Sequence, residues 1–280
     1  MLRPVEARAE LVCDTLPIGL SEDLQGIVAP LEGVFGVFAR NLDTGEVAEV
    51  NSSQVLPTES AAKTFVLLHY ARLVASGDCD PTARVAVPDD FRVGGTGVLR
   101  YLSGGLTLTL DDLAWLMIIV SDNVATALLL IEIGGPQAVN ETAADLGLTT
   151  ARLATFEEMW AGAPFGSSTA RHLAEAYGHL DDGCRQKLFH QQDLIGLPRR
   201  LEHDRFAAVD LGIEMPVRAF NKTGVGPSTF IDAGLFETDT GRWVASAMAS
   251  EIAERTTRPG DPVPVAFGEI GDALYRAWGR

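Results

Sequence analysis

Lysine is unusually rare in this chain. Of its 22 lysine and arginine residues, only Lys63, Lys187 and Lys222 are lysines. A lysine can lose its proton when it is desolvated, whereas arginine stays charged in proteins. The few lysines are therefore candidates for a role in proton transfer.

Lys63 closes the pattern Ser60-Ala61-Ala62-Lys63 at the start of an apolar segment with helical periodicity that ends at Gly77. Residues three apart lie on one face of a helix. Lys63 can accept the proton of the Ser60 hydroxyl, provided that burial or neighbouring charges lower its pKa. The pattern predicts Ser60 as a nucleophile and Lys63 as its proton partner.

Lys222 begins the pattern Lys222-Thr223-Gly224, directly after the extended segment RAFN. A strand that ends there would direct Lys222 into a cleft. Gly224, which has no side chain, would let a substrate approach the backbone.

Ser121, Asp122 and Asn123 interrupt an apolar segment that is predicted to be helical from Leu110 to Gly134. Polar groups in such a setting need partners. Ser121, placed beside Lys222, would relay a proton to a leaving nitrogen. Asn123 would hold a substrate amide or Lys63.

Each pattern alone has an ordinary structural explanation, such as a helix cap or a turn. All three in this order are the set found in class A β-lactamases and penicillin-binding proteins. The chain resembles the class A β-lactamase family from residue 33 to the last helix, and LTLDDLAWLMIIVSDNVATALLL is especially similar to its central helix. The resemblance implies an acyl-enzyme on Ser60 with Lys63 as its base, Ser121 as proton shuttle, Asn123, Lys222 and Thr223 as substrate contacts, and the N–H groups of Ser60 and Val225 as oxyanion hole.

The resemblance also implies a glutamate that activates the deacylating water. Glu157 lies 36 residues after Ser121, where the family places that residue, and Glu158 competes for the role. Ala161 and Thr155 stand where the family has an asparagine and an arginine. The segment TGVGPSTFIDAG also lacks the arginine that many members use to bind a substrate carboxylate.

Strand patterns lie at both ends of the sequence and helical patterns fill the middle. We therefore predict an α+β fold with one antiparallel sheet, built from both chain ends and flanked by terminal helices, with an inserted all-helical part. The predicted subdomains are residues 1–55 with 205–280, and residues 56–204. The expected helices are residues 4–30, 136–146, 168–180 and 264–278. The expected strands are a pair within 33–50 and three further strands at 217–220, 229–237 and 243–248. Residues 150–167 are expected to form an irregular loop.

Composition narrows the partners. The net charge of −16 opposes binding to nucleic acid, and three polar residues inside the most apolar stretch argue against a membrane span. No histidine spacing indicates a metal site, the cysteines Cys13, Cys79 and Cys184 form no zinc or disulfide pattern, and no cofactor motif is present. The first residues lack a signal peptide's apolar core, so the expected location is cytoplasmic if Met1 is the native start.

Three functions fit these observations. The first is a serine hydrolase that cleaves a β-lactam or a related amide or ester. The second is an intracellular esterase, amidase or acyltransferase on another small molecule. The third is a sensing or binding domain that is acylated without turnover. The oligomeric state stays open.

Overall fold

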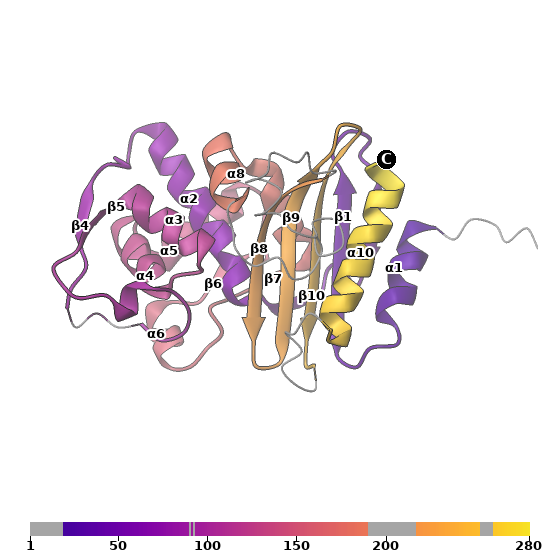
Figure 1. Cartoon of the computed structure of the whole chain (residues 1–280), viewed down its shortest axis with the longest axis horizontal. Helices are drawn as coiled ribbons and strands as arrows, with labels where there is room; N and C mark the ends of the chain where they lie inside the picture. Colours follow the sequence, from indigo (N-terminus) through magenta and orange to yellow (C-terminus); the bar gives the residue numbers. More distant parts are fainter. Residues whose placement is uncertain (1–18, 90, 92, 190–216, 253–259) are drawn as a thin grey trace, which may run out of the picture.

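The structure is a computed structural model that describes residues 19–89, 91, 93–189, 217–252 and 260–280. Predictions for the first half of the 4–30 helix, for Cys13 and for the boundary at 204/205 lie outside the described residues. Figure 1 shows a sheet with two helices on one face and a group of helices on the other.

One five-stranded antiparallel sheet forms the frame. Its order is β2 (Val47–Val50), β1 (Val34–Asn41), β10 (Arg242–Ser250), β9 (Thr229–Glu237) and β8 (Arg218–Gly226). Strand β1 pairs with β10 from Val34↔Ser250 to Asn41↔Trp243. The prediction of one sheet assembled from both ends of the sequence is therefore confirmed.

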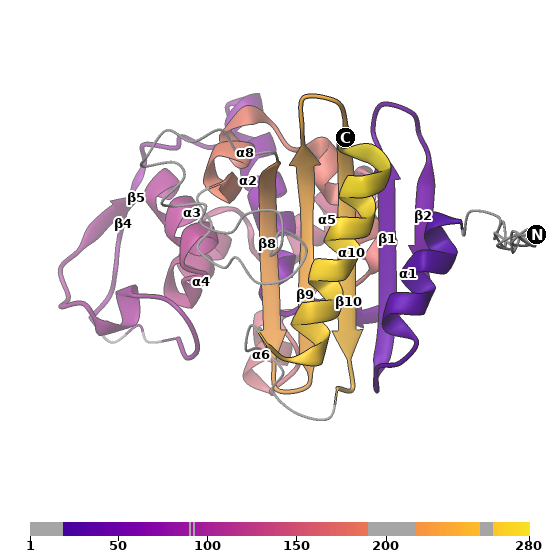
Figure 2. The same ribbon diagram turned by 45° about the vertical axis from the view of Figure 1, so that its right-hand side comes forward.

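Two terminal helices cover the outer face of the sheet. Helix α1 (Leu20–Val28) and helix α10 (Pro262–Trp278) lie side by side across it (Figure 2). Buried aromatic side chains of the sheet, such as Phe230 and Trp243, pack with Phe267 of α10 in one apolar cluster. The apolar faces of these helices explain why they stay on the sheet.

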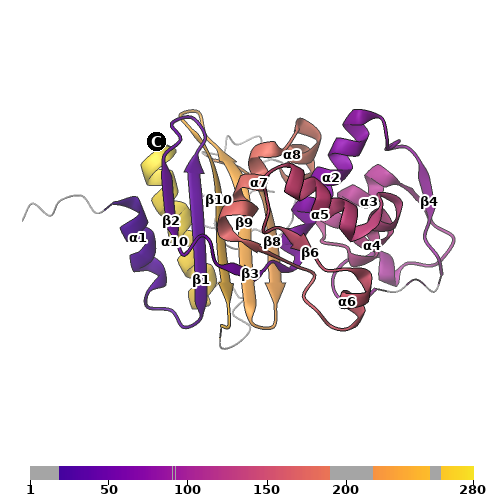
Figure 3. The same ribbon diagram turned by 180° about the vertical axis from the view of Figure 1, so that it is seen from behind.

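The remaining helices lie on the inner face and beyond β8 (Figure 3). They are α2 (Lys63–Ser76), α3 (Leu110–Ile119), α4 (Asn123–Glu132), α5 (Gly135–Asp145), α6 (Phe156–Trp160), α7 (Ala170–Ala176) and α8 (Asp182–Phe189). Helix α2 runs through this group, and every residue from Lys63 to Tyr70 is buried. It ends where predicted, because Gly77 takes the left-handed conformation at φ +83°.

Short elements connect these parts. They are the strands β3 (Val55–Pro57), β4 (Arg84–Ala86), β5 (Thr107–Thr109), β6 (Arg152–Leu153) and β7 (Gly166–Thr169), and the 3₁₀ helices η1 (Glu59–Ala62), η2 (Leu99–Tyr101) and η3 (Tyr177–His179). Strand β7 pairs with both β3 and β6. The segment 150–167, expected to be an irregular loop, therefore contains β6, α6 and the start of β7.

The predicted continuous helix from Leu110 to Gly134 is wrong in one respect. The backbone breaks at Ser121, whose φ is +53°, and resumes as α4. The carboxylate of Asp122 caps the new helix by accepting a hydrogen bond from the N–H of Ala125 at 3.0 Å. In the described part of the chain, no helix combines the length and apolarity needed to cross a membrane.

Candidate active site

Ser60 lies on a short 3₁₀ turn between β3 and α2. The turn begins with Glu59 in the left-handed region at φ +46°, a conformation that is uncommon for residues other than glycine. The N–H of Thr58 donates to the carbonyl of Gly166 at 3.0 Å, which ties the turn to β7. The Ser60 side chain is half-buried, and its hydroxyl makes no hydrogen bond to another residue that the structure describes.

Lys63 is the first residue of α2, and its side chain is buried, with 1% of the residue exposed. Its Nζ donates to the carbonyl oxygen of Ser121 at 2.8 Å, to Ser121 Oγ at 3.0 Å and to Asn123 Oδ1 at 2.8 Å. All three acceptors are neutral. Burial holds the pKa of Lys63 well below its ordinary value of 10.5. The positive charge of Lys222 lowers this pKa further, and the negative charge of Asp122 offsets part of the shift.

The break at Ser121 is fixed by Asp122, which is fully buried. Besides capping α4, its carboxylate accepts hydrogen bonds from the N–H groups of Val98 and Leu99 at 2.6 and 2.9 Å. Hydrogen bonds to an ionised carboxylate are among the stronger ones. Asp122 therefore stabilises the helix break that directs Ser121 and Asn123 towards Lys63.

The loop 94–98 supports the same break from the other side. Thr96 Oγ1 donates to the carbonyl of Ser121 at 2.7 Å, and Asn123 Nδ2 donates to the carbonyl of Gly94, also at 2.7 Å. Gly95 and Gly97 have positive φ, and a Cβ at either position would lie within 2.4 Å of Asn123 or Asp122. The sequence marks this stretch as a loop, but its role in the site was missed. The signal was the run Gly-Gly-Thr-Gly itself.

Lys222 and Thr223 lie in the interior of β8, which corrects the prediction of a strand ending near residue 220. The strand continues to Gly226 because β9 pairs with it along its full length. Lys222 is completely buried. A Cβ on Gly224 would lie 2.3 Å from the carbonyl oxygen of Thr58, so this glycine allows β8 to approach the Ser60 turn. The close approach in the structure is to that turn, whereas the sequence suggested a substrate.

Val225, the residue after Gly224, also belongs to β8 and is 44% exposed. Because Gly224 packs against the turn that carries Ser60, the backbones of residues 60 and 225 belong to contacting segments. Their N–H groups remain the predicted pair of oxyanion donors.

Tyr177 is a fully buried residue that sequence reasoning missed. Its hydroxyl is hydrogen-bonded to Thr64 Oγ1 at 3.0 Å and to the backbone of Lys222. Burial raises its pKa, so it stays neutral. Tyr177 thereby joins the helix that carries Lys63 to the strand that carries Lys222. No spacing pattern marks a single tyrosine of this kind in the sequence.

Glu157 makes no hydrogen bond or ion pair with the described residues of this group. It lies exposed on α6, and its carboxylate makes no such contact elsewhere within the described ranges. The neighbouring Glu158 has a structural role instead, because its carboxylate pairs with Arg152 at 2.6 Å and accepts the N–H of Thr155 at 2.8 Å. These contacts hold the pKa of Glu158 below its usual range. Thr155, where an arginine was expected from the resemblance, caps α6.

Known proteins share both the sequence pattern and the fold. Beta-lactamase CARB-4 of Pseudomonas aeruginosa is 26% identical over 138 residues, which are 49% of this chain and 48% of the relative. The chain thus spans about half the length of the curated relatives it matches. A beta-lactamase structure from Sphaerobacter thermophilus has a TM-score of 0.76 at 24% identity, covering 92% of this chain and 96% of that one. A PBP-A variant in an acyl-enzyme complex with penicillin G has a TM-score of 0.78 at 22% identity, covering 92% and 95%.

The two structural neighbours support the fold prediction, and a family model settles the membership. The model described as "Beta-lactamase enzyme family" matches residues 19–278, which include all three motifs. This chain therefore belongs to the beta-lactamase enzyme family.

Proposed function

We propose that this protein is a serine hydrolase that cleaves β-lactams through an acyl-enzyme on Ser60. The observation that carries the proposal is the setting of Lys63. A buried lysine held only by neutral oxygens, with its pKa lowered by burial, supplies an unprotonated amine more readily than a lysine in water. It lies one helical turn from the hydroxyl that it has to activate.

In the proposed acylation step, Ser60 Oγ attacks the lactam carbonyl carbon and its proton passes to Lys63 Nζ. The C–N bond of the lactam then breaks as the nitrogen takes a proton. Ser121 Oγ, 3.0 Å from Nζ, is positioned to relay that proton from Lys63 to the nitrogen. The step balances with no external reagent, since one proton leaves the serine and one reaches the leaving nitrogen.

The opposite wall of the site is β8. Negative charge that develops on the carbonyl oxygen would be stabilised by the N–H groups of Ser60 and Val225. Lys222 and Thr223 would bind the carboxylate of the substrate. Since the segment after Lys222 lacks the arginine that would complete a planar contact, recognition of that carboxylate would rest on Lys222 and Thr223.

Intact-mass spectrometry after mixing with benzylpenicillin tests acylation directly. We expect a mass gain equal to the whole penicillin, because the ring opens without losing atoms, and no gain in Ser60→Ala. A gain that decays while penicilloate accumulates supports hydrolysis with turnover. Persistent labelling of Ser60→Ala would show that the nucleophile is another residue. Neither a mass gain nor penicilloate in the wild-type protein would contradict β-lactams as substrates.

Deacylation is assigned to Glu157 in this proposal, on its position in the sequence. The variant Glu157→Gln should acylate normally but release the acyl group roughly 100-fold more slowly, the lower range of general-base effects. Glu158→Gln is the matched control, because its carboxylate already pairs with Arg152. If both variants release the acyl group at the wild-type rate, the base lies elsewhere.

A further inference from the structure

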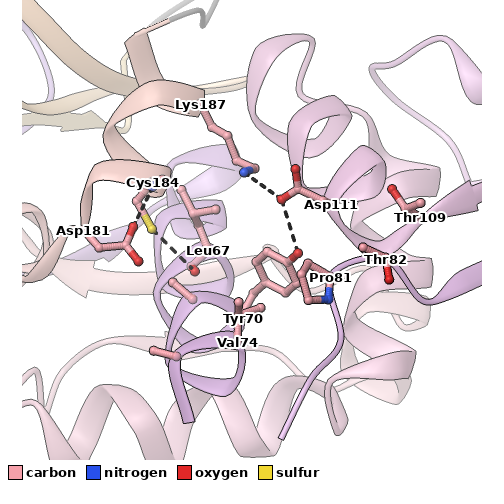
Figure 4. A pocket seen from close by; sticks show the side chains of 13 residues that line it. Leu67, Tyr70, Val74, Pro81, Thr82, Thr109, Asp111, Asp181, Cys184 and Lys187 are labelled. Carbon is pink, nitrogen blue, oxygen red and sulfur yellow. Dashed lines mark hydrogen bonds and ion pairs between the residues drawn. The ribbon is translucent and has the colours of Figure 1, made fainter. Parts of the chain in front are cut away.

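A cavity that is open to solvent lies apart from the site described above. It lies between α2, the start of α8 and the residues around the start of α3 (Figure 4). Its volume is about 440 Å³, within the ~300–1,000 Å³ usual for small-molecule sites. Among the described residues that line it, none is assigned to acylation.

One wall of the cavity is apolar. Leu67, Ala71 and Val74 of α2 line it together with Pro81, and Figure 4 labels Leu67, Val74 and Pro81. A hydrocarbon or aromatic group could be desolvated against this surface, with about 25 cal/mol gained per Å² buried.

The polar end of the cavity is formed by residues that already satisfy one another. Lys187 Nζ pairs with Asp111 Oδ1 at 2.8 Å, and the same nitrogen lies 5.0 Å from the centre of the Trp115 ring. The hydroxyl of Tyr70 donates to Asp111 Oδ1 at 3.3 Å. The charge of Lys187 is therefore compensated, which makes it a poor receptor for a ligand's anion.

Asp181 supplies a second carboxylate at the rim. Its Oδ1 accepts the N–H of Cys184 at 2.7 Å, which caps α8. No cation pairs with Asp181 among the residues that the structure describes. Among the described residues that line the cavity, two are carboxylates and one is an ammonium, so this part of the lining is net negative, as is the whole chain at −16. This balance favours a cationic ligand.

We propose that this cavity binds a small monocationic amine with an apolar body. The ammonium would contact Asp181, and the body would lie against the apolar wall of α2. Leu67 is one helical turn from Lys63, so an occupied cavity would also brace the helix that carries the proposed base. The proposal does not depend on acylation, because binding can be measured without turnover.

Calorimetric titration with three compounds of similar shape tests the proposal: 3-phenylpropylamine, 3-phenylpropanol and 3-phenylpropionate. We expect the amine to bind roughly threefold or more tightly than the alcohol, as a partly exposed ion pair would give, and the anion to bind most weakly. Equal affinity for the three compounds, or no binding of the amine, would overturn the proposal.

Two variants locate the binding. Ala71→Phe should fill the cavity and abolish binding, with thermal unfolding as the check that the variant folds. Asp181→Asn should retain the helix cap, since asparagine caps as well as aspartate, but remove the preference for the amine over the alcohol. Asp182→Asn is the matched control, because Asp182 is exposed and does not line the cavity. An unchanged preference in Asp181→Asn would contradict the proposal even if Ala71→Phe failed to fold.

Discussion

Lys63 and Lys187 are both buried near α2, yet their partners are opposite in kind. Lys187 pairs with the carboxylate of Asp111 and lies over an aromatic ring. Lys63 is hydrogen-bonded to the neutral oxygens of Ser121 and Asn123. A carboxylate partner stabilises the ammonium form, whereas neutral partners in a desolvated setting leave it unstable.

The difference supports the proposal that Lys63 works as a base. Burial alone does not separate the two residues, since both are among the buried side chains. What separates them is the charge of the atoms around Nζ. Lys187 has the environment of a structural ion pair, and Lys63 has that of a group prepared to give up its proton.

Replacement of each lysine by arginine should break the comparison most clearly. Lys63→Arg keeps a positive charge but cannot deprotonate, so we expect acylation by benzylpenicillin to slow by about 10²- to 10⁴-fold. Lys187→Arg preserves the pair with Asp111 and should acylate at nearly the wild-type rate. The measurement is the rate of mass gain. Wild-type acylation by Lys63→Arg would remove Lys63 from the role of base.

Replacement by methionine should change stability by different amounts at the two positions. Lys187→Met leaves Asp111 unpaired. Since Asp111 is partly exposed, the loss should be about 1–2 kcal/mol, less than the ~3–5 kcal/mol for breaking a fully buried pair. Lys63→Met removes a desolvated amine but also leaves the oxygens of Ser121 and Asn123 without their donor, so the two effects oppose each other and the net loss at neutral pH should be smaller than for Lys187→Met. Urea unfolding measures both. Destabilisation of equal size in the two variants would mean that their environments are energetically alike.

The dependence on pH sharpens the comparison further. The pKa of Lys63 is lower in the folded chain than its ordinary value of 10.5. Between the folded and unfolded pKa values the unfolded chain binds more protons, so this residue adds stability as pH rises through that window. The wild type should therefore gain stability relative to Lys63→Met as pH approaches 10.5. A difference that stays constant with pH would contradict the lowered pKa.

In the proposed mechanism, the protonation state of Lys63 also controls the rate of acylation. Acylation by the wild type should rise with pH, by at most about tenfold per unit, as Lys63 loses its proton. Lys187→Arg should follow the same profile, which makes it the control. A flat profile in both proteins would show that the proton on Lys63 does not limit the rate.

Much of the proposed acylation site, formed by Ser60, Lys63, Ser121 and Asn123, follows from the sequence. The serine–lysine spacing predicted a helix start that carries both residues, and the polar interruption at residues 121–123 predicted partners for buried polar groups. These are local signals, and the structure brings Lys63, Ser121 and Asn123 together. The sheet from both chain ends was also predictable, because strand patterns appear only there.

Other features depend on contacts that periodicity does not report. Apolar residues flank Ser121 on both sides, so the helical pattern hides the break that Asp122 stabilises. The length of β8 is set by pairing with β9 rather than by its own residues. Glu157 was placed by spacing, but its exposure is decided by the packing of the short helix α6, where Glu158 takes the contacts with Arg152 and Thr155.

The pairing of β1 with β10 has a consequence for the order of events during synthesis. Val34 pairs with Ser250, so the sheet cannot close until most of the chain has been made, and contacts this distant slow folding. Helix α2 can form early, but its neighbour Lys222 arrives with the late strands. A nascent chain would therefore carry Ser60 and Lys63 without the wall that completes their site, and reactivity would appear only in the finished fold.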